Sequence, residues 1–175
     1  VAKKAKVKLI TYRIEGGYLT QPRWATSIRR GKVRGRLINI YEPEQLSQMS
    51  DAQISEAIIT DLHEDAYETQ KRECVKFKGN NLALGLESTI FTCPKCGKIG
   101  KLHSQNDRIF CECGFEAIYD VYGYLIDKED NKYTVTELDL KQQNALKEKI
   151  KNWPESTPLF EDDVTVYRIG ADHEL

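Results

Sequence analysis

The chain has 175 residues, of which 40% are hydrophobic and 30% charged, and its 26 basic side chains nearly balance 27 acidic ones. This composition is typical of a globular protein with a moderate core, and it excludes intrinsic disorder for most of the chain. It also excludes a global electrostatic attraction to nucleic acid or anionic lipid, and no apolar run is long enough to span a bilayer.

Apolar and β-branched residues predict two strands near the N-terminus. Residues 7–14 have few polar interruptions, which predicts a strand covered on both faces, as in the sheet of an α/β protein. Gly16 and Gly17 end this strand because glycine adopts positive φ freely. Residues 33–41 predict a second strand after an irregular loop, with Gly35 at a bulge or at a close approach of two chain segments.

A long amphipathic helix is predicted next. Ser50 and Gln53 form a capping-box pattern, and apolar residues then recur every four positions, which predicts a helix over 51–72. Turn residues follow in the segment 76–86, which has little periodicity and indicates a boundary near Leu84.

Beyond this boundary the sequence changes to short strand-like pieces separated by cysteines and glycines, which predicts a small β-rich unit. The pieces are 89–92, 108–110, 115–119 and 122–126. Apolar residues between 138 and 150 predict another helix, which Pro154 stops, and 164–169 predicts a last strand. The expected parts are therefore 1–84, 85–127 and 128–175.

Four of the five cysteines lie close together in two pairs, each followed by a glycine. They are Cys93, Cys96, Cys111 and Cys113, spaced as C-x2-C and C-x-C. Four thiolates can surround Zn²⁺ tetrahedrally and leave no open coordination position, so the pattern predicts a structural zinc ribbon. Two disulfides or a redox C-x2-C are the alternative, but Cys111 and Cys113 are too close to bridge without strain. The absence of an export signal also favours a reducing, intracellular setting.

The other cysteine and the histidines are given simpler interpretations. His103 lies within the predicted ribbon hairpin and is expected on its surface, while Cys74 is expected to be a buried hydrophobic residue. His63 is expected to be an exposed helix residue. No nucleophile constellation and no phosphate-cradling glycine motif is present in the sequence.

The stretch between Glu15 and Glu42 contains six cations and no acid. The cations are Arg23, Arg29, Arg30, Lys32, Arg34 and Arg36. Because guanidinium groups bind phosphate in a bidentate way and Trp24 suits a half-wet interface, the stretch predicts contact with phosphate or lipid headgroups. A solvated hairpin whose cations pair with the acidic helix explains the same pattern, and both interpretations stay open.

Several segments resemble a known family. They are residues 8–24 (KLITYRIEGGYLTQPRW), Asp65-Ala66-Tyr67-Glu68, and residues 82–87 (LALGLE) leading into Cys93-Pro94-Lys95-Cys96-Gly97. Over about residues 1–124 the chain resembles the C-terminal part of bacterial 1-acylglycerol-3-phosphate (lysophospholipid) acyltransferases, in the branch that carries a zinc ribbon. The resemblance implies an α/β fold: the end of an acyltransferase domain, whose last conserved strand matches residues 7–14, then the ribbon and a short helix and strand tail.

The resemblance also implies an activity. In that family a His-x4-Asp motif supplies the base that deprotonates the acceptor hydroxyl, and a Glu-Gly-Thr-Arg motif binds the phosphate of the acceptor. Neither motif is in this sequence, since Glu68 stands where an aspartate would follow His63. The chain is therefore expected to be a fragment, with both ends cut through a longer protein. The parent would transfer an acyl group from acyl-CoA or acyl carrier protein to 1-acylglycerol-3-phosphate, and the fragment alone would be inactive.

Finally, the resemblance implies substrate-binding residues and a location. Arg13, Arg23, Arg29 and Arg30 are expected to bind the phosphate of the acceptor or an anionic membrane surface. The protein is expected to be cytoplasmic and peripheral to the inner face of the membrane. A competing hypothesis makes the ribbon a binding module for nucleic acid or protein, since it contains several basic residues, but it has no row of aromatic residues for base stacking.

Overall fold

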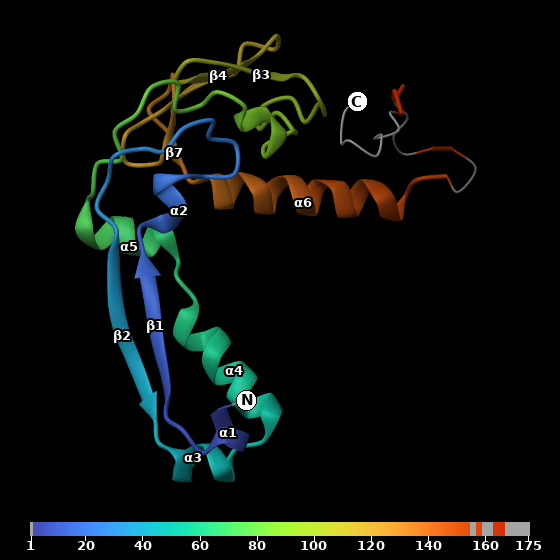
Figure 1. Ribbon diagram of the computed structural model, residues 1–175. Coiled ribbons are helices and arrows are strands. Elements are labelled where there is room, and N and C mark those ends of the chain that lie inside the picture. The colour runs from blue at the N-terminus through green and yellow to red at the C-terminus, as the bar shows by residue number, and fades with distance from the viewer. Residues whose placement is uncertain (1, 155–156, 159–162, 167–175) are drawn as a thin grey trace. The chain divides into compact units, whose positions relative to one another are not determined.

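The computed structural model describes residues 2–154, 157–158 and 163–166. These residues form a mixed α/β protein with a two-stranded sheet, a five-stranded sheet and several helices. The chain divides into two compact units, Val1–Gln142 and Gln143–Leu175. Both sheets, whose strands are seen in Figure 1, lie within the first unit, and so does the boundary predicted near Leu84.

The two-stranded sheet is an antiparallel hairpin of β1 (Leu9–Glu15) and β2 (Arg34–Tyr41), close to the predicted strands. The pairing shifts between Thr11 and Tyr12, so a bulge is present. The close approach predicted at Gly35 is confirmed, because a Cβ atom there would lie 2.3 Å from the Tyr12 ring. Only glycine lets the ring lie across this strand.

One face of the hairpin is apolar and exposed. Its members are Ile10, Tyr12 and Ile14 on β1, which are 55%, 57% and 61% exposed, and Leu37 and Ile40 on β2. The buried positions on β1 are the polar residues Thr11 and Glu15. The prediction that both faces of the first strand are covered is therefore wrong for the described residues, because only the polar face packs against neighbouring elements.

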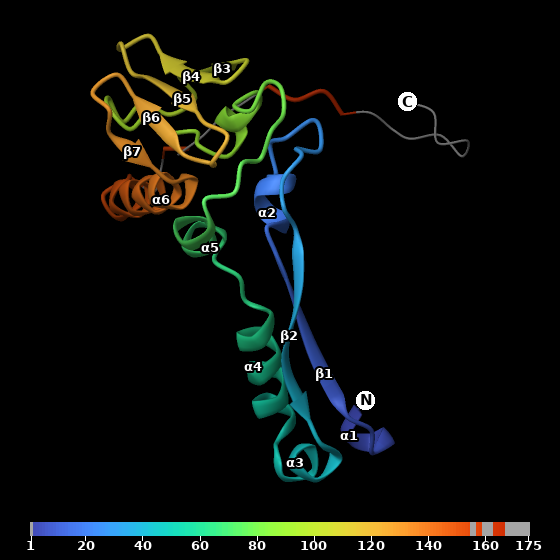
Figure 2. The same cartoon turned by 90° about the vertical axis from the view of Figure 1, so that its left-hand side faces the viewer.

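The segment predicted as one helix over 51–72 forms two helices, α4 (Asp51–Leu62) and α5 (Ala66–Glu73). The predicted capping box at the start of α4 is confirmed. Asp65 interrupts the helix because its carboxylate accepts the backbone N–H groups of the next turn, those of Tyr67 and Glu68. Figures 1 and 2 both show α4 lying alongside β1.

Short helices precede and connect these elements. They are α1 (Ala2–Ala5), α2 (Gly17–Thr20) and α3 (Pro43–Gln48). Together with β1 and α4, helices α1 and α3 surround a hollow of about 680 Å³. Its lining is mostly apolar and includes Leu9, Leu46 and Ile54.

The five-stranded sheet is an antiparallel meander that follows a 3-10 turn, η1 (Leu86–Ser88). Its strands are β3 (Leu102–Gln105), β4 (Arg108–Cys111), β5 (Glu116–Tyr119), β6 (Leu125–Asp127) and β7 (Lys132–Tyr133). The strands predicted over 108–110 and 115–119 are confirmed, whereas residues 89–92 contribute no strand and the piece predicted over 122–126 begins three residues later.

The last helix, α6 (Val135–Lys151), begins earlier than the predicted start at 138. Its first turns belong to the first unit, where Val135 and Leu138 are buried. Of the strand predicted over 164–169, residues 164–166 have no regular structure, and the remainder lies outside the described residues.

The core of the first unit joins the loop after α2 to the five-stranded sheet. Trp24, in this loop, is 5% exposed, and its ring meets that of Tyr119 on β5 edge to face at 5.6 Å. Its indole Nε1 donates to the carbonyl of Leu82 at 3.0 Å. Trp24 therefore lies in the interior, and the half-wet environment predicted for it is wrong.

Candidate metal centre

The four clustered cysteines converge on one point, as their spacing predicts. Cys93 and Cys96 precede β3, Cys111 ends β4, and Cys113 lies in the turn before β5. Their sulfur atoms all lie within 4.8 Å of one another, with Sγ to Sγ distances of 3.6 Å for Cys93 and Cys113 and 3.9 Å for Cys96 and Cys111. All four thiols are free.

These distances fit a metal ion better than a disulfide. Sulfurs placed about 2.3 Å from a central Zn²⁺ at the corners of a tetrahedron are about 3.8 Å apart. A disulfide needs its two sulfurs at about 2.05 Å. The cluster can therefore hold a four-coordinate ion, and all four donors are soft thiols of the kind that zinc prefers.

Both cysteine pairs lie in tight turns that depend on the glycine after each pair. Gly97 and Gly114 adopt φ values of +68° and +87°, in the region that favours glycine. The Gly97 N–H donates to the carbonyl of Cys93, and the Gly114 N–H to that of Cys111. These turns direct other backbone N–H groups at the sulfurs of Cys93 and Cys113, and such contacts would orient the sulfurs toward a bound ion.

The β3 and β4 hairpin brings the second pair back to the first. Its register places Leu102 opposite Cys111, while the Cys93 N–H donates to the carbonyl of Lys98 before β3 begins. Cys93 and Cys111 are also members of the hydrophobic core. The site is thus built into the base of the sheet.

Burial and backbone dipoles give the thiols different acidities. Burial raises the pKa of Cys93 to about 12, whereas the backbone N–H of Phe115 lowers the pKa of Cys113 to about 7. Metal binding requires the thiolate form of each ligand, so it must displace protons from the buried sulfurs. Affinity for metal is therefore expected to rise with pH.

The neighbouring candidates do not join this cluster. His103 is exposed and its ring lies tilted against that of Phe110, with centroids 5.9 Å apart. No His, Asp or Glu of the described residues completes a group with the four sulfurs. His63 is exposed as predicted. Cys74 is exposed, and the prediction of a buried side chain is wrong because α5 ends there with Cys74 in the left-handed region.

The four arginines predicted to bind substrate do not share one location. Arg29 is 3% exposed: its Nη2 donates to the Leu82 carbonyl at 2.7 Å, and its guanidinium lies over the rings of Trp24 and Tyr119. Arg23 and Arg30 are exposed. Their proposed roles in substrate binding stay predictions, but the guanidinium of Arg29 is already engaged with the interior.

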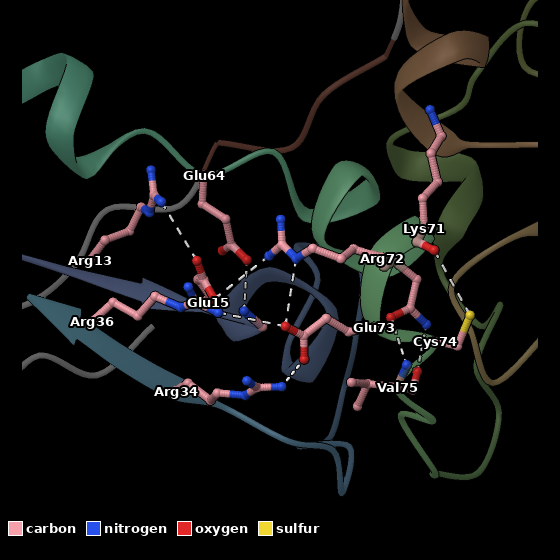
Figure 3. A network of polar contacts seen from close by, with 12 residues as sticks. Arg13, Glu15, Arg34, Arg36, Glu64, Lys71, Arg72, Glu73, Cys74 and Val75 are labelled. Carbon is pink, nitrogen blue, oxygen red and sulfur yellow. Dashed lines mark hydrogen bonds and ion pairs between the residues drawn. The ribbon is translucent and has the colours of Figure 1, made fainter. Parts of the chain in front are cut away.

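Arg13 belongs to a network of charged side chains that the sequence does not predict. It lies near Glu15 with three other arginines, Arg34, Arg36 and Arg72, and a second carboxylate, Glu73 (Figure 3). The acid-free stretch after Glu15 was a signal for the arginines of β2. No local pattern indicates Arg72, because its position depends on where α5 packs.

Comparisons with known proteins add no relative. No protein-family model matches the chain, and neither the curated proteins nor the solved structures contain a significant match. Among the described residues, no helix combines the length and apolar character needed to cross a membrane. What the structure itself defines is a mixed α/β chain with a four-thiol candidate metal centre at one end of an antiparallel sheet.

Proposed function

We propose that the four thiols bind one Zn²⁺ ion with a structural role. The site offers four protein ligands, which leaves no coordination position for a substrate or an attacking water. Two of the ligands lie in the core of a sheet with short strands, so the ion would contribute to its folding. Metal analysis of protein purified without added zinc should give about one zinc per chain. A value near zero, with four thiols free to react, would contradict the proposal.

We further propose that the chain is part of a phospholipid-synthesis acyltransferase, which transfers an acyl group from acyl-CoA or acyl carrier protein to 1-acylglycerol-3-phosphate. The observation that supports this is the uncovered apolar face of the β1 and β2 hairpin. Strands of an α/β sheet are covered on both faces, so a hairpin with one bare apolar face fits as part of a larger α/β domain. The sequence resemblance supplies the identity of that domain.

The proposal assigns no catalytic residue to this chain. The base that activates the acceptor hydroxyl belongs to a His-x4-Asp motif, which the sequence lacks. The exposed Arg23 and Arg30, with the partly exposed Arg13, stay available to an acceptor phosphate or to an anionic membrane surface.

The coding region upstream of Val1 tests this proposal. A His-x4-Asp motif followed by a Glu-Gly-Thr-Arg motif in the same reading frame is expected. The protein encoded there should transfer a labelled acyl group to 1-acylglycerol-3-phosphate, whereas the present chain alone should not. A start codon directly before Val1 would overturn the proposal.

A binding module for nucleic acid or protein is the second candidate function. Lys95, Lys98 and Lys101 are exposed around the first cysteine pair, which favours contact with an acidic partner. Filter binding of the zinc-loaded chain to single-stranded RNA and DNA at low salt separates the two candidates. Retention that falls steeply with added salt supports the binding module, and no retention supports the acyltransferase.

A further inference from the structure

The charged network between the hairpin and α5 contains more arginine side chains than are required to pair with its carboxylates. Two carboxylates lie inside it, Glu15 with a side chain 6% exposed and Glu73 with one 15% exposed. Four guanidinium groups surround them, and their side chains are more exposed. These are Arg13 at 28%, Arg34 at 34%, Arg36 at 46% and Arg72 at 56%. One buried and one mostly buried acid therefore lie beneath a layer of more exposed cations.

The charges of this network do not balance. Four arginines against two glutamates leave an excess of two positive charges. Glu64 lies nearby, and its Oε1 accepts the N–H of Gly16 at 2.8 Å (Figure 3). Counting Glu64 still leaves one positive charge in excess. A network that only fastened α5 to the hairpin would not require this surplus, since one arginine per carboxylate would suffice.

Most of the guanidinium N–H groups are also not committed to hydrogen bonds within the network. Apart from the close pair of Arg34 and Glu73, the shortest contact is 3.0 Å from Arg36 Nε to Glu15 Oε2, without hydrogen-bond orientation. The remaining contacts are 3.6 Å for Arg13 and Glu15, 3.9 Å for Arg72 and Glu15, 3.7 Å for Arg36 and Glu73, and 3.6 Å for Arg72 and Glu73. Separations of this length hold charges together but are too long for hydrogen bonds, so these guanidinium N–H groups have no acceptor within the network.

Arg13 shows the same surplus at one buried atom, although its side chain as a whole is partly exposed. Its Nη1 donates to the His63 carbonyl at 3.0 Å, but its Nε is buried and has no hydrogen-bond partner among the described residues. A buried donor without an acceptor is costly. An acceptor that enters beside Arg13 would remove this cost.

We propose that Arg13, Arg34, Arg36 and Arg72 form a binding site for a phosphate group. A phosphate carries one to two negative charges near neutral pH, which matches the surplus, and its oxygens accept paired N–H groups from guanidinium. The carboxylates of Glu15 and Glu73 hold the arginines in place before the anion arrives, which lowers the entropy cost of binding. The phosphate can belong to a free ion or to an anionic lipid headgroup. Phosphate binding at this site can be measured directly, and the proposal does not depend on whether the parent protein transfers acyl groups.

The test uses the full, zinc-loaded chain and inorganic phosphate. Phosphate is titrated at constant ionic strength, with chloride as the compensating anion, and the arginine Nε–Hε signals are followed by NMR. Saturable shifts of the network arginines are expected with phosphate and not with chloride. Arg72→Gln should weaken binding about tenfold, because it removes a paired, charge-assisted contact. Arg72→Lys keeps the charge but not the fork, so it should recover only part of the affinity.

Lys71 provides a matched control one residue away. Lys71→Gln makes the same change in charge on the same helix, but Lys71 pairs with the exposed Glu68 and points away from the network in Figure 3. Equal weakening by Lys71→Gln and Arg72→Gln would overturn the proposal, because it would show a general charge effect. The zinc content and melting temperature of each variant show whether it is folded. If Arg72→Gln does not fold, Arg36→Gln is used in its place.

Vesicles distinguish the source of the phosphate. The site is assigned to a lipid headgroup if the chain sediments with phosphatidic acid vesicles but not with phosphatidylcholine vesicles. This sedimentation should be lost in Arg72→Gln and kept in Lys71→Gln. Saturable binding of inorganic phosphate without vesicle binding assigns it to a soluble phosphate. Binding to neither would overturn the proposal. Acyl transfer enters none of these readouts, so its presence or absence in the parent protein leaves this result unchanged.

Discussion

Arg29 is the residue whose environment differs most from what its sequence context indicates. It lies among exposed cations in the chain, yet its guanidinium is buried and has no carboxylate partner among the described residues. Two aromatic rings and the carbonyl of Leu82 take the place of a counter-ion. The aliphatic part of the Arg29 side chain and its planar guanidinium therefore both join the loop after α2 to β5.

Replacing Arg29 should cost stability, whereas replacing the adjacent arginine should not. Arg29→Ala is expected to lower the free energy of unfolding by about 2 kcal/mol, because it leaves a cavity beside Trp24 and Tyr119. Arg30→Ala, at an exposed side chain, is expected to change it by less than about 0.5 kcal/mol. Urea denaturation of the zinc-loaded proteins measures both, and equal effects would show that Arg29 is not part of the core.

Asp61 of α4 is a buried acid that, like Arg29, is held by uncharged groups. It is 7% exposed and accepts hydrogen bonds from Thr11, Asn39 and Tyr41, at 2.7 Å each. Burial raises the pKa of Asp61, but the hydrogen bonds outweigh this effect and hold the pKa below its ordinary value. The ionised carboxylate is thus the form that joins α4 to both strands of the hairpin.

Asp61→Asn should destabilise the protein by about 2 kcal/mol at neutral pH, because an amide cannot accept all three donors. Since the folded pKa lies below the unfolded value of about 3.9, the contribution of the carboxylate is present above that pH and is lost as pH falls through the folded pKa. The difference in unfolding free energy between the two proteins, measured in urea from pH 7 to pH 3, should therefore shrink at the acid end. Comparing two proteins that share the metal site cancels the effect of acid on metal binding, and a constant difference would contradict the assignment.

At the scale of elements, the candidate metal centre shares its core with the five-stranded sheet and not with the hairpin. Cys93 and Cys111 belong to the core cluster that contains Leu102, Ile109 and Ala117 of β3, β4 and β5. The β1 and β2 hairpin is instead joined to α4 by the contacts of Asp61. Loss of the ion is therefore expected to affect the two sheets differently.

Chelation should open the five-stranded sheet first. After treatment with a strong zinc chelator, hydrogen exchange measured by mass spectrometry should accelerate most in peptides covering residues 102–119, because four unpaired thiols replace the ion at the base of the sheet. Peptides covering residues 9–15 and 51–62 should change less. Uniform acceleration across all of these peptides would show that the ion stabilises the whole first unit.

At the scale of the whole molecule, large apolar residues on the exposed face of the hairpin are expected to stabilise the described fold less than those in its interior. Ile14 is 61% exposed on this face, whereas Leu46 of α3 is fully buried. Both are large aliphatic side chains. Their difference in burial predicts a difference in stability.

Ile14→Thr should leave the free energy of unfolding of this chain within about 0.5 kcal/mol, since threonine keeps the β-branched shape and little apolar contact is lost. Leu46→Ala should lower it by about 3 kcal/mol through loss of burial and creation of a cavity. Urea denaturation compares the two. A large loss for Ile14→Thr in this chain would mean that the apolar face is covered in solution.

Much of the local structure and the candidate metal ligands could be predicted from the sequence, because they depend on residues near one another in the chain. The spacing of Cys93, Cys96, Cys111 and Cys113 was sufficient to predict their cluster, and the identity of the ion stays a proposal. The capping box at Ser50 also predicted the start of α4. The interruption between α4 and α5 also depends on nearby residues, since Asp65 is a good N-cap. The apolar repeat through this segment nevertheless favoured one long helix.

The sequence by itself determined both strands of the hairpin, the start of α4 and the grouping of the four thiols, since periodicity, capping and short spacing act over a few residues. Only the tertiary structure decided that Arg29 lies in the core, that Glu15 and Glu73 collect arginines from three elements, and that one face of the hairpin is exposed. These features depend on the packing of residues far apart in the chain, where burial and charge are set by neighbours that no local pattern identifies.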